Sequence, residues 1–165
     1  MNFSFELTNT IKQQVEIIDA ALVRLNQPPF FENLDFVFDG DSAGTFQLIA
    51  RRKSCDRNFA TIEFHLLGDG LRVDIDNIPE TFMWSSDEIT NKHDLILAFL
   101  CDMLRCFVLV ERSKSGIVVK LFDPLGNLID SINVRNLGLF PKNNLKDITG
   151  HLFFPIYAGS GHSDT

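Results

Sequence analysis

Two aspartates separated by a single residue form the first pattern in this sequence that could do chemistry. Asp39 and Asp41 follow the apolar run Phe36 to Phe38, within the segment LDFVFDGDSAGT. A carboxylate can act as a nucleophile, as an acid or base, or as a ligand for a hard cation. The same residue types also suit a polar turn between two strands, because Asp, Gly and Ser favour turn conformations.

The segment from Leu34 to Thr45 resembles the nucleophile motif of haloacid-dehalogenase-type phosphatases, in which an apolar strand delivers Asp-x-Asp. The resemblance implies that Asp39 would attack phosphorus and that Asp41 would act as acid or base beside Mg²⁺. The later motifs of that family, a Lys and a paired-acid segment at strand ends, have no match in the rest of the chain. We therefore expect a turn here, and we keep an enzyme that uses Asp39 and Asp41 as an alternative.

No complete metal-ligand pattern is found along the sequence, so we expect no metal and no cofactor. Read as a calcium loop, the segment that begins at Asp39 places Ala50 where a bidentate Glu is required. The four histidines show no i, i+4 pair and no HExxH motif, so no zinc site is predicted. His65 lies within an expected strand, where we predict a surface or half-buried side chain.

Cys55 is the candidate reactive thiol, because basic residues on both sides of it could lower its pKa. No His can be placed beside it as a base, so an ordinary loop residue is the favoured interpretation. The three cysteines form no CxxC pair, and the N-terminus has no apolar leader. Both features favour a reducing compartment, and we expect a cytoplasmic protein.

Hydrophobic periodicity predicts an α+β fold, with a mostly antiparallel sheet of about six strands and two helices packed on one face. One helix is expected over 11–25, capped by Thr10 with Gln13. A second is expected within 86–105, capped by Ser85 with Glu88 and most buried over 94–104. Strands are expected at 36–38, 45–51, 59–67, 71–75, 106–111, 117–122 and 128–134.

Turn residues predict a hairpin, and chain length predicts the number of domains. Gly68 to Gly70 predicts a hairpin, and the alternation from Leu71 to Asp76 places Asp74 and Asp76 on a face open to water. At 165 residues the chain fits one domain, which we expect over 1–158 with a disordered tail at 159–165.

The formal net charge is −7, and the acidity is local. Segment 32–41 contains four acidic residues and no basic one, and segment 69–94 contains seven acidic residues against two basic ones. Such a surface repels nucleic acid and anionic membranes and attracts a basic protein. We expect the two acidic segments to converge on one face.

These features favour a non-enzymatic protein-binding module. The leading hypothesis is a small acidic immunity protein, monomeric or homodimeric, that neutralises a basic bacterial toxin of the nuclease type. An acidic secretion chaperone is an alternative, and an enzyme that uses Asp39 with Asp41 or Cys55 is a second one. The predicted partner-binding residues combine aromatic and acidic side chains: Phe31, Asp39, Asp41, Asp74, Asp76, Glu80, Phe82 and Trp84.

Overall fold

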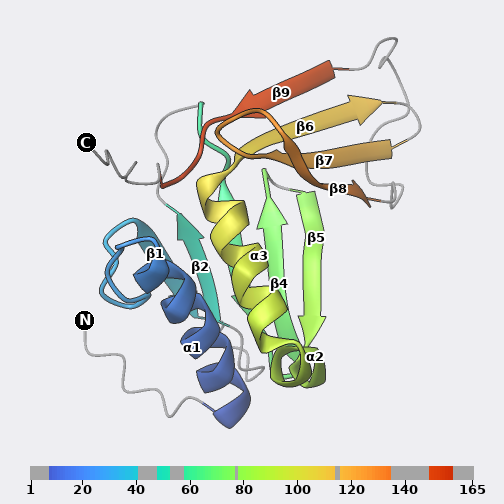
Figure 1. Ribbon diagram of the computed structural model, residues 1–165. Coiled ribbons are helices and arrows are strands. Elements are labelled where there is room, and N and C mark those ends of the chain that lie inside the picture. Colours follow the sequence, from blue (N-terminus) through green and yellow to red (C-terminus); the bar gives the residue numbers. More distant parts are fainter. Residues whose placement is uncertain are drawn as a thin grey trace. The chain divides into compact units, whose positions relative to one another are not determined.

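The computed structural model describes residues 8–40, 48–52, 58–76, 78–113, 116–134 and 149–157. Within these residues, antiparallel strands form one sheet of five strands and one of four, accompanied by three helices (Figure 1). The predicted α+β class is confirmed, whereas the single sheet of about six strands is wrong, because the strands divide between two sheets.

The chain forms two compact units. The first comprises Met1–Lys53 and Thr61–Leu100, and the second comprises Ser54–Ala60 and Cys101–Thr165. The expectation of one domain over 1–158 stays a prediction. The expected tail at 159–165 lies outside the described residues.

The five-stranded sheet of the first unit pairs its strands in chain order. The strands are β1 (Phe36–Gly40), β2 (Leu48–Arg52), β3 (Ile62–Leu66), β4 (Gly70–Ile75) and β5 (Ile78–Ser85). The predicted hairpin is confirmed, since β3 and β4 pair with Ile62 opposite Ile75 and Leu66 opposite Leu71. Strand β5 was not predicted. The strand order leaves β1 at one edge of the sheet and β5 at the other.

Helix α1 (Asn9–Arg24) packs on β3 and β4 of this sheet. It begins after Thr8, whose hydroxyl accepts the Ile11 N–H at 3.3 Å, so Thr8 and not Thr10 is the N-cap. The side of α1 that it buries consists mainly of apolar residues: Ile11, Val15, Ile17, Ile18, Ala21 and Leu22. Burial of this face gives the helix most of its stability, as is usual for helices of this length.

Helices α2 (Ser86–Asn91) and α3 (His93–Arg105) follow β5. The predicted capping box is confirmed, because Ser85 and Glu88 each bond to the other's backbone N–H. Residues 94–104 of α3 were expected to form the most buried helical segment, but Leu95 is 71% exposed, so only one side of the helix is covered. Figure 1 shows α1 and the beginning of α3 on the same face of the five-stranded sheet. No helix in the described part of the chain is long and apolar enough to cross a membrane.

The two faces of β3 and β4 differ in chemistry. Apolar side chains occupy the face beneath the helices, and all of them are fully buried: Ile62, Phe64, Leu66, Leu71, Val73 and Ile75. Because successive side chains of a strand point to opposite faces, the residues between them belong to the second face. That second face carries charged and polar side chains.

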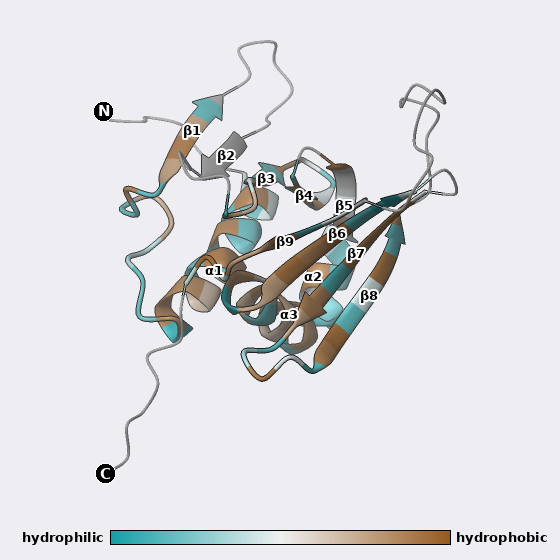
Figure 2. Ribbon diagram, turned by 90° about the horizontal axis from the view of Figure 1, so that it is seen from above, coloured by the Kyte–Doolittle hydropathy of each residue, from teal (hydrophilic) through white to brown (hydrophobic). Residues whose placement is uncertain are grey.

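The four-stranded sheet belongs to the second unit. Its strands are β6 (Phe107–Ser113), β7 (Gly116–Phe122), β8 (Leu128–Val134) and β9 (Thr149–Phe153), in the spatial order β8-β7-β6-β9. The predicted meander of the first three is confirmed, whereas β9, which pairs with β6, was not predicted. Figure 2 shows hydrophobic residues along the first part of β6 and a mixture of hydrophobic and hydrophilic ones along β8.

Candidate functional site

The predicted partner-binding residues lie at several separate places in the five-stranded sheet. Asp39 lies on β1, while Glu80, Phe82 and Trp84 lie on β5, with three strands between them. The acidic segments 32–41 and 69–94 therefore lie toward opposite edges of the sheet, and the expectation that they converge on one face is wrong. Asp41 and the side chain of Glu80 lie outside the described residues.

Two of these residues are not exposed as expected. Asp74 is 7% exposed, so the prediction that its side chain faces water is wrong. Phe82 is also 7% exposed, and its ring packs against Phe99 with 4.6 Å between centroids. Trp84 is half-buried and stacks on Phe82. Burial removes Asp74 and Phe82 from the surface that a partner could reach.

Exposed apolar and acidic side chains are interspersed in the segment just before and along β1. Its apolar members are Phe31, Leu34 and Val37, with 45%, 85% and 46% of their surface exposed. Its acidic members, Glu32, Asp35 and Asp39, are also exposed. We call these six residues the 31–39 surface. It contains two of the predicted partner-binding residues, Phe31 and Asp39.

The backbone beneath this surface is held by buried contacts. Phe30 is fully buried, and its ring lies 5.3 Å from Phe36 and 5.9 Å from Phe64 of β3. Its backbone N–H donates to the Asp19 carboxylate on α1. The buried Asn33 side chain accepts the backbone N–H of Asp35 at 2.9 Å. Buried contacts therefore support the backbone of the 31–39 surface.

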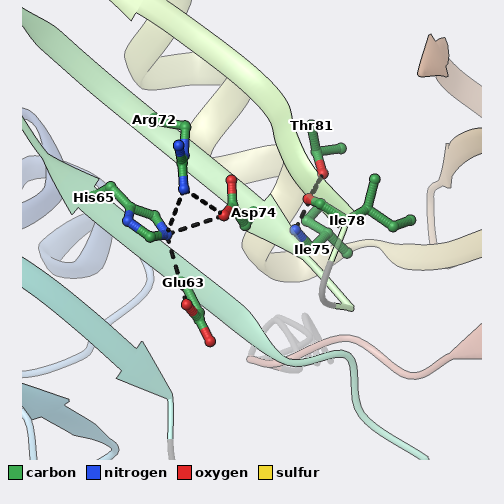
Figure 3. Close-up of polar contacts among 7 residues, drawn as sticks. All are labelled: Glu63, His65, Arg72, Asp74, Ile75, Ile78 and Thr81. Carbon is green, nitrogen blue, oxygen red and sulfur yellow. Dashed lines mark hydrogen bonds and ion pairs between the residues drawn. The ribbon is translucent and has the colours of Figure 1, made fainter. Parts of the chain in front are cut away.

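A second cluster of polar side chains lies on the face of β3 and β4 that the helices do not cover (Figure 3). Glu63 and His65 lie two residues apart on β3, and the register sets Asp74 opposite Glu63 and Arg72 opposite His65. His65 Nε2 lies 3.0 Å from Asp74 Oδ2 and 3.6 Å from Glu63 Oε2. Arg72 Nη2 donates to the same Asp74 oxygen at 3.0 Å. We call these four residues the polar cluster.

Burial affects the protonation of His65 in this cluster. His65 is 5% exposed, so the prediction of a surface or half-buried side chain is wrong. Burial lowers the pKa of His65 below its usual 6.5, although the Asp74 carboxylate opposes that change. The imidazole is therefore neutral at pH 7. Since a carboxylate only accepts hydrogen bonds, the neutral ring donates through Nε2–H to Asp74.

The backbone around Asp74 is fixed by the side chain of Thr81. The pairing of β4 with β5 changes register between Val73 and Ile75, and Asp74 stands at that irregularity. The Thr81 hydroxyl accepts the Ile75 N–H at 3.1 Å and donates to the Ile78 carbonyl at 2.8 Å (Figure 3). These bonds satisfy backbone groups that the shifted ladder leaves without a strand partner.

The resemblance to phosphatases finds no counterpart in the fold around Asp39. Strand β1 is followed by β2, which pairs with it in the antiparallel direction. A phosphatase of the haloacid-dehalogenase type would instead continue from its nucleophile strand into a helix and a parallel strand. Asp41, the expected acid or base, lies outside the described residues.

The described cysteines are buried thiols. Cys55, the candidate reactive thiol, lies outside the described residues. Cys101 and Cys106 are 8% and 1% exposed. Burial raises the pKa of the Cys106 thiol to about 11, and the nearby Asp102 carboxylate adds to the effect. A thiol with so high a pKa is a poor nucleophile at pH 7, because the thiolate is the reactive form.

Comparisons of the chain with models of known protein families, with curated proteins and with solved structures find no match. Function must therefore be inferred from the chemistry of the 31–39 surface and of the polar cluster.

Proposed function

We propose that this chain is a protein-binding module that neutralises a basic partner, acting in the cytoplasm as an immunity protein against a toxin of the nuclease type. The observation that carries the proposal is the 31–39 surface, where exposed apolar side chains stand among exposed carboxylates on a backbone held by buried contacts. Leu34, at 85% exposure, and Phe31, at 45%, present apolar area that the described part of the chain leaves uncovered.

The apolar members of the surface supply the affinity in this proposal. Interfaces draw most of their binding energy from a few apolar or aromatic side chains that lose all contact with water, surrounded by a polar rim. Phe31 is anchored for this role, because its ring contacts the rings of Phe30 and Phe38 at 5.6 and 5.2 Å. A side chain that is already ordered loses little conformational entropy when a partner binds.

The acidic members supply the preference for a basic partner. Glu32, Asp35 and Asp39 are exposed, and no basic residue occurs in segment 32–41. Complementary charge accelerates diffusional encounter and rejects partners of the same sign. A nuclease is such a partner, since the surface that binds nucleic acid must be basic.

The first test of the proposal is the association rate. A partner captured from an extract of the native host and then purified is mixed in a stopped-flow instrument with the wild-type chain and with Asp35→Lys/Asp39→Lys. We expect the reversed chain to associate at least about tenfold more slowly at low salt, and the difference to shrink as salt screens exposed charges over about 8 Å. Equal rates at every salt concentration would exclude the 31–39 surface as the steering site.

The matched control for charge reversal is Asp87→Lys/Asp94→Lys. Both aspartates are exposed and lie on α2 and α3, which follow β5, the edge strand opposite β1. The control chain has the same net charge as the reversed chain, so it separates a local effect from a change in total charge. We expect it to associate at nearly the wild-type rate.

A further inference from the structure

We propose that Glu63, His65 and Asp74 bind a divalent metal ion of the zinc type, and that the ion displaces the guanidinium of Arg72 from Asp74. This site is independent of the 31–39 surface and of the partner proposed for it. The sequence alone predicts no such site, because its ligands come from two strands that only the sheet register brings together.

The separations of the three ligand atoms match the needs of such an ion. One nitrogen or oxygen from each residue lies within 4.8 Å of the other two. His65 Nε2 lies 3.0 Å from the Asp74 oxygen and 3.6 Å from the Glu63 oxygen. Bonds of about 2.0–2.1 Å to tetrahedral zinc require ligand atoms about 3.3 Å apart, so small side-chain rotations suffice.

The donor types select the class of ion. An imidazole nitrogen with carboxylate oxygens suits zinc and its neighbours among the transition metals, whereas calcium and magnesium favour oxygen-only sites. Three protein ligands leave the fourth position of tetrahedral zinc for a water molecule.

The sheet holds the ligands in place before an ion arrives. Glu63 and His65 project from the same face of β3, because they are two residues apart, and Asp74 lies directly opposite Glu63. His65 and Asp74 are 5% and 7% exposed, and the bonds of Thr81 fix the backbone on which Asp74 stands. Rigid ligands on paired strands reduce the entropy that binding an ion would otherwise cost.

Arg72 is the cation with which the ion competes. Its Nη2 atom lies 3.0 Å from Asp74 Oδ2 and 3.4 Å from His65 Nε2, close to the position that an ion would take. The Arg72 side chain is 24% exposed, and that of Glu63 is 17% exposed. In this proposal the guanidinium moves toward solvent, and the ion enters along the same side of the cluster.

The test is calorimetric titration of the full, tag-free chain with Zn²⁺ after treatment with EDTA. We expect one ion per chain, and a visible absorption band when Co²⁺ replaces Zn²⁺. His65→Gln and Glu63→Gln should each weaken Zn²⁺ binding by more than about tenfold, the loss that is common even for residues outside the ligand set. Glu63→Gln keeps the test valid if the more buried His65 variant does not fold.

The Arg72→Gln variant separates metal binding from a simple ion-pair network. Removing the competing cation should tighten Zn²⁺ binding, whereas unchanged or weaker binding would refute displacement of Arg72. His93→Gln is the matched control, because His93 also lies beside a carboxylate, 3.4 Å from Asp94, but on an exposed part of α3. Absence of Zn²⁺ binding by the wild-type chain, or binding that His93→Gln abolishes and Glu63→Gln does not, would overturn the site.

Discussion

Replacement of Asp74 by Asn distinguishes the burial of this residue in the structure from the exposure that strand alternation predicts for it. The side chain of Asp74 is 10% exposed, and its Oδ2 atom lies 3.0 Å from both His65 Nε2 and Arg72 Nη2. Asparagine keeps the size and one acceptor oxygen, so the variant loses the charge without opening a cavity. Alternation along β4 predicts a residue that faces water and hence almost no effect.

The expected loss follows from these contacts. Hydrogen bonds to charged groups contribute about 1.5–3 kcal/mol each, and water screens part of the effect at Arg72, which is 24% exposed. We therefore expect Asp74→Asn to lower the free energy of unfolding by about 2–3 kcal/mol. In a chain of this size that corresponds to a fall in Tm of about 4–12 °C.

The assay is urea unfolding with EDTA present, so that only the metal-free chain is measured. Asp69→Asn is the control, because Asp69 is exposed in the turn between β3 and β4, a position that Asn also suits. We expect the control to change stability by less than about 0.5 kcal/mol. Equal effects at the two positions would mean that Asp74 is not part of a buried cluster.

Two further predictions concern buried residues of the two units. Phe30→Ala should cost about 3–5 kcal/mol in urea unfolding, since a fully buried ring is lost, and a cost below about 1 kcal/mol would contradict its place beneath the 31–39 surface. For Cys106, the pKa is about 11 in the folded chain against 9.0 as the ordinary value, so the folded state keeps a proton that the unfolded state releases. Stability should therefore fall as pH rises from 9 to 11, and the fall should be smaller in Cys106→Ala, as unfolding measured across that range would reveal.

Features that depend on near neighbours in the sequence were predicted well. The capping box of Ser85 and Glu88 and the β3–β4 hairpin are both confirmed, because each is determined within a few residues. The amphipathic spacing of α1 likewise predicts which side of the helix is buried. Its N-cap was wrong by two residues, since Thr8 and Thr10 are equally suitable in type and only the backbone conformation distinguishes them.

Strand β5 was missed because Pro79 lies within it. Proline cannot donate a backbone hydrogen bond, so it argues against a central strand, but β5 is an edge strand, where that loss is tolerated. Strand β9 was missed because its pairing with β6 joins residues far apart in the chain. The pairing of β9 with β6 leaves no local signal in the sequence.

The polar cluster could not be predicted, since it depends on register. Alternation correctly separates Leu71, Val73 and Ile75 from the residues between them, but it does not say that the second face is also buried. The register sets Glu63 and His65 on β3 opposite Asp74 and Arg72 on β4. Only the pairing of the strands brings these four polar side chains together in one cluster.

The most direct test of the proposed function compares two leucines of equal exposure. Leu34 is 85% exposed within the 31–39 surface, and Leu125 is 87% exposed in the turn between β7 and β8. The dissociation constant of the purified partner is measured by calorimetry for the wild-type chain, for Leu34→Ser and for Leu125→Ser. The account predicts that Leu34→Ser weakens binding by about tenfold or more, as expected when an interface anchor is lost, and that Leu125→Ser binds like the wild type. Unchanged binding by Leu34→Ser, or an equal loss in both variants, would contradict it.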